Sequence, residues 1–352
     1  MKKIQFFLIN VRRKKIWFSF LIFVFLPIYN LIWEYIINFH GKLLYFFWLF
    51  RKKEFFNFSK NSTLIVKNEK NFIDLANSIK EFFPKKKIED IISKNKKTLV
   101  SNKTDTDLTD FKFNINNEIS PILKEKILNF VFSDKNLSTA SNYLKVFPIV
   151  SLVSLHLNVP VDDKLERGSM LWHKDDFGFK SLDLFVTISN LDFDNGPLYF
   201  LKKKNPLGVF AKIEEIVENP RPGERNKIEI DTFNKYYKET DTDVLIGKPG
   251  DALFIDSCRT YHRGGYCKSN NRLMLRITYQ TPDNIRKSVL KDEFIKDHST
   301  YRLEKNIFTR YAYLKELNFF LNLINIKKCL MFFYRTLHFK MNLKNIQNLF
   351  TN

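Results

Sequence analysis

The sequence predicts a mainly β core with α-helices at both of its ends. Three stretches of the middle region carry the alternating or continuously apolar pattern of β-strands, namely Val150–Val159, Leu182–Ile188 and Arg272–Gln280. Residues before 146 and after 282 instead space their apolar residues as helices do. With 352 residues, the chain has room for one core of roughly 200–250 residues and for extensions beyond it.

Residues 1–60 form a hydrophobic and basic segment, for which we expect helices. Within it, Ile16–Ile37 is apolar except for Ser19, Asn30 and Glu34, and it has the ~20-residue length that spans a bilayer. Both flanks are basic, so the orientation rule does not decide, and no small-residue cleavage site follows. Three interpretations are open: a helix lying in the membrane interface, an anchor in which residues 16–37 span the membrane, or a helical hairpin packed on the core.

Helical patterns and one loop precede the strands. Phe72–Phe83 has helical apolar spacing and ends before Pro84, and Ile88–Ser93 predicts a further short turn of helix. Pro121–Phe132 is amphipathic, with its proline in the first turn. Asn95–Asn117 is rich in Lys, Thr, Asp and Asn, which predicts a surface loop.

The second half of the chain combines strands, turns and one long insertion. Asp192–Pro197 predicts a turn into a strand at Leu198–Leu201, and Asp243–Asp256 contains another strand. Asn205–Thr242 is a charged insertion; long loops in compact domains often bind ligands, so we expect a lid, with a decorated surface loop as the alternative. Asn318–Phe350 has the composition of an interfacial helix or of a helix packed under the core.

The residues that carry chemistry are centred on His173 and Asp175. On a strand, residues two apart point to the same face, so this imidazole and this carboxylate would project together. They supply two members of the 2-His-1-carboxylate set that holds non-haem Fe(II) and leaves three positions open, and His262 is the candidate third. The pair alone is equally typical of a surface strand. His156 has no carboxylate two residues away, so we interpret it as an ordinary strand residue.

A basic residue, Arg272, follows His262 by ten positions. An iron oxygenase that uses 2-oxoglutarate needs a cation there, because the far carboxylate of the buried cosubstrate must be paired. Arg276 is a rival for this role, since Arg272 and Arg276 share one face of the predicted strand and both can point inward.

In their order, these motifs resemble the phytanoyl-CoA dioxygenase family of Fe(II)/2-oxoglutarate-dependent oxygenases over residues 140–282. The motifs are Trp172-His173-Lys174-Asp175, Asn195-Gly196-Pro197-Leu198, Gly250-Asp251-Ala252, His262 and Arg272. One departure is Leu201–Pro206, which stands where the family has Pro-Gly-Ser-His beside the substrate region, so the substrate can differ. The resemblance implies a double-stranded β-helix, the jelly-roll fold of cupins, within residues 61–290, with basic amphipathic helices over 291–352.

The resemblance also implies a mechanism. Fe(II) would be bound by His173, Asp175 and His262, and 2-oxoglutarate by Arg272, with Arg276 as the alternative. O2 is the second cosubstrate, and oxidative decarboxylation of 2-oxoglutarate gives succinate. Related halogenases replace the carboxylate ligand with a small residue so that chloride can bind, so Asp175 favours hydroxylation or desaturation here.

Three further residues have roles by position. Thr187 matches a family position near the cosubstrate, where its hydroxyl could bond a carboxylate; an ordinary β-branched strand residue is the alternative. Trp172 and Asp176 flank the ligands and are expected to shape the pocket or to support the ligands from behind. Lys174 should point away from the metal.

The chain is strongly basic and has few cysteines. Its formal net charge is +20, which favours anionic partners, but 37 phenylalanines and abundant Lys, Asn and Ile indicate a coding bias, and no recognition motif supports nucleic-acid binding. Cys258, Cys267 and Cys329 have no framework spacing and are interpreted as ordinary reduced residues. We therefore expect a cytoplasmic protein, at the inner face of a membrane if residues 1–53 and 318–350 associate with it.

The leading hypothesis is an Fe(II)/2-oxoglutarate-dependent dioxygenase that hydroxylates a small-molecule or lipid-linked substrate. Two alternatives come from other classes: a non-catalytic jelly-roll binding protein that retains a metal site, and a membrane-associated structural protein. The sequence predicts no particular oligomeric state.

Overall fold

The structure of the protein is a computed structural model that describes residues 39, 41–51, 53–58, 62–101, 111–160, 166–175, 181–202 and 227–281. The candidate membrane segment 16–37, residues 205–226 of the predicted lid and the predicted helices over 291–352 lie outside these ranges. Among the helices within them, none combines the length and the apolar character needed to cross a membrane. The domain boundaries stay predictions.

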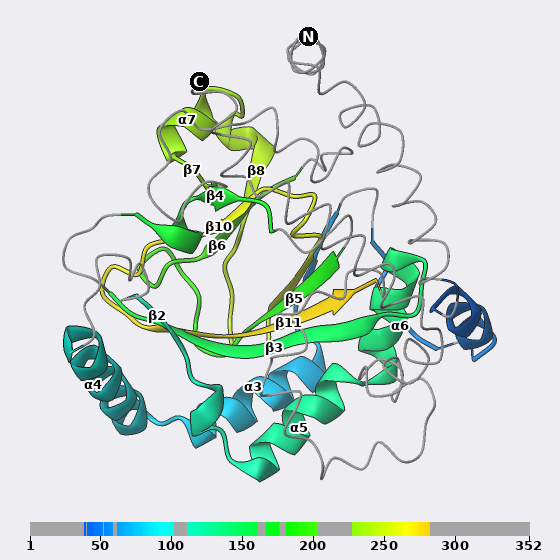
Figure 1. The fold of residues 1–352 in the computed structure, drawn as a ribbon, viewed down its shortest axis with the longest axis horizontal. Coiled ribbons are helices and arrows are strands. Elements are labelled where there is room, and N and C mark those ends of the chain that lie inside the picture. The colour runs from blue at the N-terminus through cyan, green and yellow to red at the C-terminus, as the bar shows by residue number, and fades with distance from the viewer. Residues whose placement is uncertain are drawn as a thin grey trace, which may run out of the picture. The chain divides into compact units, whose positions relative to one another are not determined.

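Two antiparallel sheets form the core (Figure 1). The six-stranded sheet has the order β1 (Thr63–Val66), β9 (Ala252–Ile255), β5 (Ser181–Thr187), β11 (Arg272–Gln280), β3 (Ile149–Asn158) and β2 (Lys112–Asn114). The five-stranded sheet has the order β7 (Lys227–Ile228), β4 (Trp172–His173), β10 (His262–Gly264), β6 (Leu198–Leu201) and β8 (Thr242–Leu245).

The strand order is that of a jelly roll. From β3 onward the chain passes between the sheets, with β3, β5, β9 and β11 in the larger sheet and β4, β6, β8 and β10 in the smaller one. In the larger sheet β11 pairs with β3 on one side and with β5 on the other. The predicted fold class, a double-stranded β-helix with flanking helices, is confirmed.

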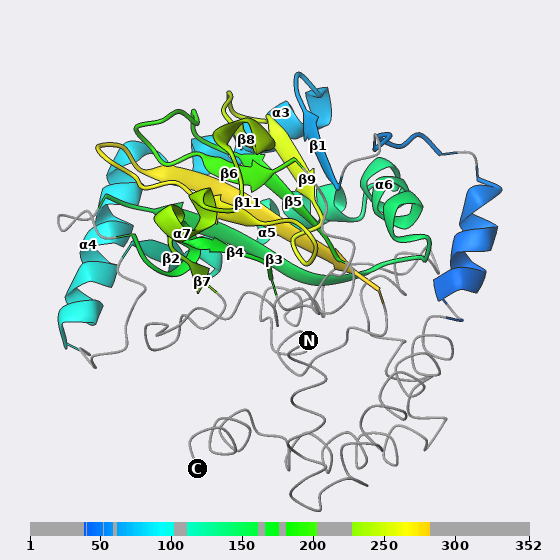
Figure 2. The same ribbon diagram turned by 90° about the horizontal axis from the view of Figure 1, so that it is seen from above.

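Helices cover one face of the larger sheet. α3 (Lys70–Phe82) and α5 (Pro121–Val131) lie beneath it, while α4 (Lys85–Ser101) and α6 (Asp134–Leu144) lie toward its opposite ends (Figures 1 and 2). The Tyr279 hydroxyl of β11 donates to the Val131 carbonyl of α5 at 2.7 Å. Because side chains alternate along a strand, the odd-numbered residues of β11 face these helices and the even-numbered ones face the smaller sheet.

Most predicted elements are found near their expected positions. Pro121 occupies the first turn of α5, after Ser120, whose hydroxyl accepts from the Leu123 backbone at 3.3 Å. The loop predicted from Asn95 was wrong in its first part, because α4 continues to Ser101; lysines favour helix on an exposed face, and polarity alone does not separate such a helix from a loop. The predicted loop was also wrong in its last part, which contains β2. The elements β1, α6, β7, β10 and α7 (Ile230–Asn234) were not predicted either.

The described part of the N-terminal segment includes a helix over residues 41–49. Trp48 anchors it: its indole N–H donates to Ser138 Oγ at 2.8 Å, and its ring lies 5.1 Å from that of Phe147. Other apolar side chains of this helix are exposed, including Leu43, Phe46 and Phe47. The segment therefore packs on α6 through one face.

The long insertion is partly built into the core. Its described portion contains β7, which extends the smaller sheet, and α7 (Ile230–Asn234). Phe233 of α7 stacks on Trp172 with ring centroids 4.0 Å apart. The lid over Asn205–Thr242 stays a prediction, and residues 205–226 of it lie outside the described residues.

Candidate metal centre

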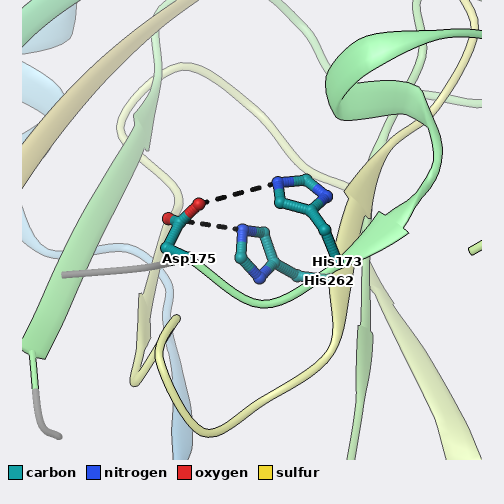
Figure 3. Close-up of side chains that lie close together, drawn as sticks. All are labelled: His173, Asp175 and His262. Carbon is teal, nitrogen blue, oxygen red and sulfur yellow. Dashed lines mark ion pairs between the residues drawn. The ribbon is translucent and has the colours of Figure 1, made fainter. Parts of the chain in front are cut away.

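Three side chains from two adjacent strands and the following loop meet between the sheets (Figure 3). His173 ends β4 and His262 begins β10, and the two residues are directly paired in the smaller sheet. Asp175 lies two residues beyond His173, where its backbone N–H donates to the Ser257 carbonyl at 2.9 Å. We expected Asp175 on the strand itself; β4 ends earlier, and this hydrogen bond turns the carboxylate toward the histidines.

The ligand atoms of this cluster surround a common point. His173 Nε2 lies 3.7 Å from Asp175 Oδ1, and His262 Nε2 lies 3.7 Å from Asp175 Oδ2, as the dashed lines of Figure 3 show. All three ligand atoms lie within 4.8 Å of one another. These separations are too long for hydrogen bonds. They suit ligands that close on a metal ion at about 2.0–2.2 Å from each.

Hydrogen bonds select the histidine tautomer that a metal requires. Nδ1 of His173 lies 2.8 Å from the Leu171 carbonyl, and Nδ1 of His262 lies 3.1 Å from the Thr260 carbonyl. A carbonyl only accepts, so each Nδ1 carries the proton and each neutral ring presents its Nε2 lone pair to the centre. Burial lowers the pKa of both histidines, which keeps the rings neutral.

The carboxylate is held in its charged form. Burial alone would raise the pKa of Asp175, but the positive charge of the Arg276 guanidinium opposes this effect, and the pKa is lowered. Arg276 Nη2 donates to Asp175 Oδ2 at 2.5 Å. Two neutral imidazoles and one carboxylate, all largely buried, are the donor set of a non-haem iron site.

Arg276 also binds a second carboxylate, which sequence reasoning missed. Its Nη2 lies 2.8 Å from Asp183 Oδ2, and its Nε lies 3.3 Å from Asp183 Oδ1. Asp183 is fully buried on β5 and also accepts from the Thr278 hydroxyl. A lone aspartate in the apolar run Leu182–Ile188 was a signal for such a partner, because a buried charge must be paired.

Arg272 is placed differently from Arg276. Its guanidinium is buried and donates through Nη1 to the Gly196 carbonyl, while its Nε has no hydrogen-bond partner. Within the described ranges of the chain it forms no ion pair. Burial lowers the pKa of Arg272. Gly264 leaves room for it, since a Cβ there would stand 3.0 Å from Arg272 Nη2. Among the residues that the structure describes, Arg272 is thus a buried cation without a counter-ion.

The hydroxyl of Thr187 is already engaged. Its Oγ1 donates to the Lys248 carbonyl at 2.5 Å and also lies 2.9 Å from the Asp251 carbonyl. A hydroxyl has one proton, and a carboxylate can only accept, so the cosubstrate contact expected for Thr187 conflicts with this arrangement. Here the residue ties β5 to the turn before β9.

The remaining predicted residues lie around the ligand strand. Trp172 points away from the ligands and stacks on Phe233, so it supports β4 from the far side and does not line the centre. Lys174 also points away, as expected, with its Nζ 3.8 Å from the centroid of the Tyr261 ring. Asp176 lies outside the described residues.

The described cysteines are not ligands of this cluster. Cys258 and Cys267 are buried, they form no disulfide within the described residues, and neither belongs to the metal-ligating group there. Cys329 lies outside the described residues. His156 sits within β3, as expected for a strand residue.

Comparison with known proteins gives structural similarity alone. No family model matches the sequence, and no curated protein matches it. Among solved structures, EctD from S. alaskensis has a TM-score of 0.40 and 14% identity, covering 66% of this chain and 78% of that chain. The epimerase SnoN, in complex with Fe3+, alpha-ketoglutarate and nogalamycin RO, has a TM-score of 0.36 and 12% identity, covering 62% and 79%. The carbocyclase SnoK from nogalamycin biosynthesis has a TM-score of 0.33 and 11% identity, covering 63% and 84%. At this level the similarities do not bear on the activity of this chain.

Proposed function

We propose that this chain is an Fe(II)/2-oxoglutarate-dependent oxygenase that hydroxylates a small-molecule substrate and forms succinate from 2-oxoglutarate. The observation that carries the proposal is one buried arrangement: two neutral imidazoles and a charged carboxylate converge, and a guanidinium without a counter-ion lies on the inner face of the same barrel. On the order of its motifs, we propose a place near the phytanoyl-CoA dioxygenase family.

The three ligands fit the metal that this function needs. His173, Asp175 and His262 would hold Fe(II) from one side and leave positions for 2-oxoglutarate and O2. When bound, the metal would activate O2, which is the oxidant, while 2-oxoglutarate and the substrate would each supply two of the four electrons that reduce it. The chain itself keeps both Nε2 atoms unprotonated through the Nδ1 bonds, and it keeps the carboxylate charged through Arg276.

Arg272 fits the cosubstrate better than Arg276 does. The guanidinium of Arg276 is already neutralised by Asp175 and Asp183, so an additional carboxylate would have to compete with both. Arg272 has no such partner, and a buried cation gains most from a charge-assisted bond to an anion. We therefore assign the far carboxylate of 2-oxoglutarate to Arg272.

Several finer points belong to the proposal. Because Asp175 would be the third ligand of the metal, a halide could not bind at its position. This supports hydroxylation. A cytoplasmic location and membrane association through residues 1–53 and 318–350 stay predictions. The non-catalytic binding protein is the alternative that the experiment below separates.

The test measures metal binding, cosubstrate binding and succinate formation in the full chain. Mn(II) binding is followed by electron paramagnetic resonance and 2-oxoglutarate binding by calorimetry, before Fe(II)-loaded protein is exposed to air. Asp175→Asn should weaken Mn(II) binding by about 10–100-fold or more, whereas Asp243→Asn, at an exposed carboxylate of β8, should not change it.

A separate variant, at Arg272, tests the 2-oxoglutarate site. Arg272→Met should weaken 2-oxoglutarate binding by about tenfold or more and leave Mn(II) binding unchanged. Binding of both ligands without slow succinate formation, even across a panel of substrates, would favour the non-catalytic alternative. Absence of Mn(II) binding by the unaltered chain would refute the proposal.

A further inference from the structure

Lys112 is a second cation on the inner face of the larger sheet. It lies on the edge strand β2 and is paired with Asn158 of β3, which is paired in turn with Arg272 of β11. Residues paired across antiparallel strands project from the same face of the sheet. Lys112 therefore points to the side that Arg272 and Arg276 share, and its side chain is half-buried there.

The smaller sheet contributes a further lysine at the same edge of the barrel. Lys227 of β7 is directly paired with His173 of β4, so it projects from the face that carries this ligand. β2 and β7 extend the two sheets beyond β3 and β4, which are consecutive strands of the core. Lys112 and Lys227 are close enough to repel each other electrostatically.

Positive charge exceeds negative charge in this region. The positive charges of Arg276, Arg272 and Lys227 repel that of Lys112. Among the described residues, the carboxylates that oppose these cations on the inner faces are Asp175 and Asp183. Arg276 engages both of those carboxylates. Within the described part of the chain, Lys112 forms no ion pair. Burial, and then the neighbouring arginines, lower the pKa of Lys112 to about 7.

Binding of the metal and 2-oxoglutarate would not remove this excess of positive charge. A divalent metal would be balanced by Asp175 and by one carboxylate of 2-oxoglutarate, and the other carboxylate would be balanced by Arg272. Arg276 is balanced by Asp183. Lys112 would remain a half-buried ammonium group without an anion, an arrangement that is costly unless a bound molecule supplies one.

We infer that Lys112, in the positive potential that Lys227 reinforces, binds an anionic group of the substrate, either a phosphate or a carboxylate. That the ligand is a substrate rests on the proposed function, whereas the anion site itself does not. A lysine is suited to either group, because its ammonium carries three donors and acts as a point charge.

Inorganic phosphate and acetate are the probes for this site. The full chain is loaded with Mn(II) and saturating 2-oxoglutarate near pH 6.5, about half a unit below the pKa of Lys112, so that most of the lysine is charged. Phosphate binding is read from the relaxation that Mn(II) causes in the phosphorus nucleus, which reports only ions near the metal. Acetate is then added as a competitor: displacement identifies a site that accepts carboxylates, and no displacement identifies one selective for phosphate.

Three variants test the assignment. Lys112→Met should weaken phosphate binding about tenfold or more, Lys112→Arg should keep it within about threefold, and Lys80→Met, at an exposed lysine of α3, should not change it. The affinity for 2-oxoglutarate should stay the same in all of them. Equal phosphate binding in Lys112→Met and Lys80→Met would overturn the inference, as would a loss of 2-oxoglutarate binding instead of phosphate binding, which would assign Lys112 to the cosubstrate.

Failure of the proposed function gives a different result. If the unaltered chain bound neither Mn(II) nor 2-oxoglutarate, the proposed function would fail, and phosphate would then be tested by its protection of the metal-free chain against thermal unfolding. Protection lost in Lys112→Met and kept in Lys112→Arg would still support the anion site. Absence of protection in the unaltered chain would refute it.

Discussion

Replacing Asp183 by asparagine should destabilise the protein through Arg276. The carboxylate is fully buried and accepts two bonds from this guanidinium, at 2.8 and 3.3 Å. At 2.8 Å, two unit charges attract by about 6 kcal/mol at an effective dielectric constant of about 20. Asparagine keeps the shape and one acceptor, and Asp175 still balances part of the charge, so we expect a net loss of about 3 kcal/mol, the low end for breaking a buried ion pair.

The assay is urea unfolding of the metal-free chain, followed by tryptophan fluorescence. In thermal unfolding, a loss of about 3 kcal/mol corresponds to a fall of about 4 °C in Tm for a chain of 352 residues. Asp243→Asn, which removes an exposed carboxylate of β8, is the matched control and should change stability by less than about 0.5 kcal/mol. Equal free energies of unfolding for the Asp183 and Asp243 variants would show that the buried ion pair stabilises the protein by less than its distances imply.

A double variant separates the stability contributed by the Asp183–Arg276 ion pair from that contributed by the surrounding residues. Asp183→Leu alone leaves Arg276 partly uncompensated, whereas Asp183→Leu with Arg276→Met removes both charges from the same site. Replacing a buried ion pair by apolar residues is often neutral, while removing one partner is costly. The double variant should therefore be more stable than Asp183→Leu, and strict additivity of the two single losses would refute the reasoning.

Three further changes test other parts of the structure. Phe233→Ala removes the stack on Trp172 and should cost about 3–5 kcal/mol in urea unfolding, whereas Tyr236→Ala, 78% exposed in the unaltered chain, should cost less than about 0.5 kcal/mol; similar losses would contradict the stack. Gly196→Ala should lower stability by more than about 2 kcal/mol, since its φ is 73° and a Cβ would overlap a neighbouring backbone carbonyl; stability like that of the unaltered chain would contradict this backbone geometry. Sulfate, which does not titrate, should bind more weakly at pH 8 than at pH 6, by up to about tenfold, because Lys112 has a pKa of about 7 and loses its charge over this range; a flat profile would exclude that lysine.

Local patterns in the sequence predicted the longer core strands, and together with the family resemblance they predicted the group that His173, Asp175 and His262 form. Val150–Val159 and Arg272–Gln280 were each placed to within one residue, because alternation of side chains along a strand is a property of the segment itself. The end of α3, which Pro84 marks, was placed to within one residue and its start to within two. Helix α6 was missed because Asp134–Leu144 is rich in Ser, Thr and Asn, and its helical form depends on burial of that surface in the fold.

By itself, therefore, the sequence determined the order of the longer core strands, and the order of its motifs, with the family resemblance, placed His173, Asp175 and His262 in one group. Only the tertiary structure decided which arginine lacks a counter-ion. Arg272 and Arg276 share one face of one strand, and the difference between them comes from Asp183, which register brings beside Arg276 from a strand 93 residues away in the chain. Electrostatic partnership depends on distance in space, and strand pairing fixes that distance only when the sheet has formed.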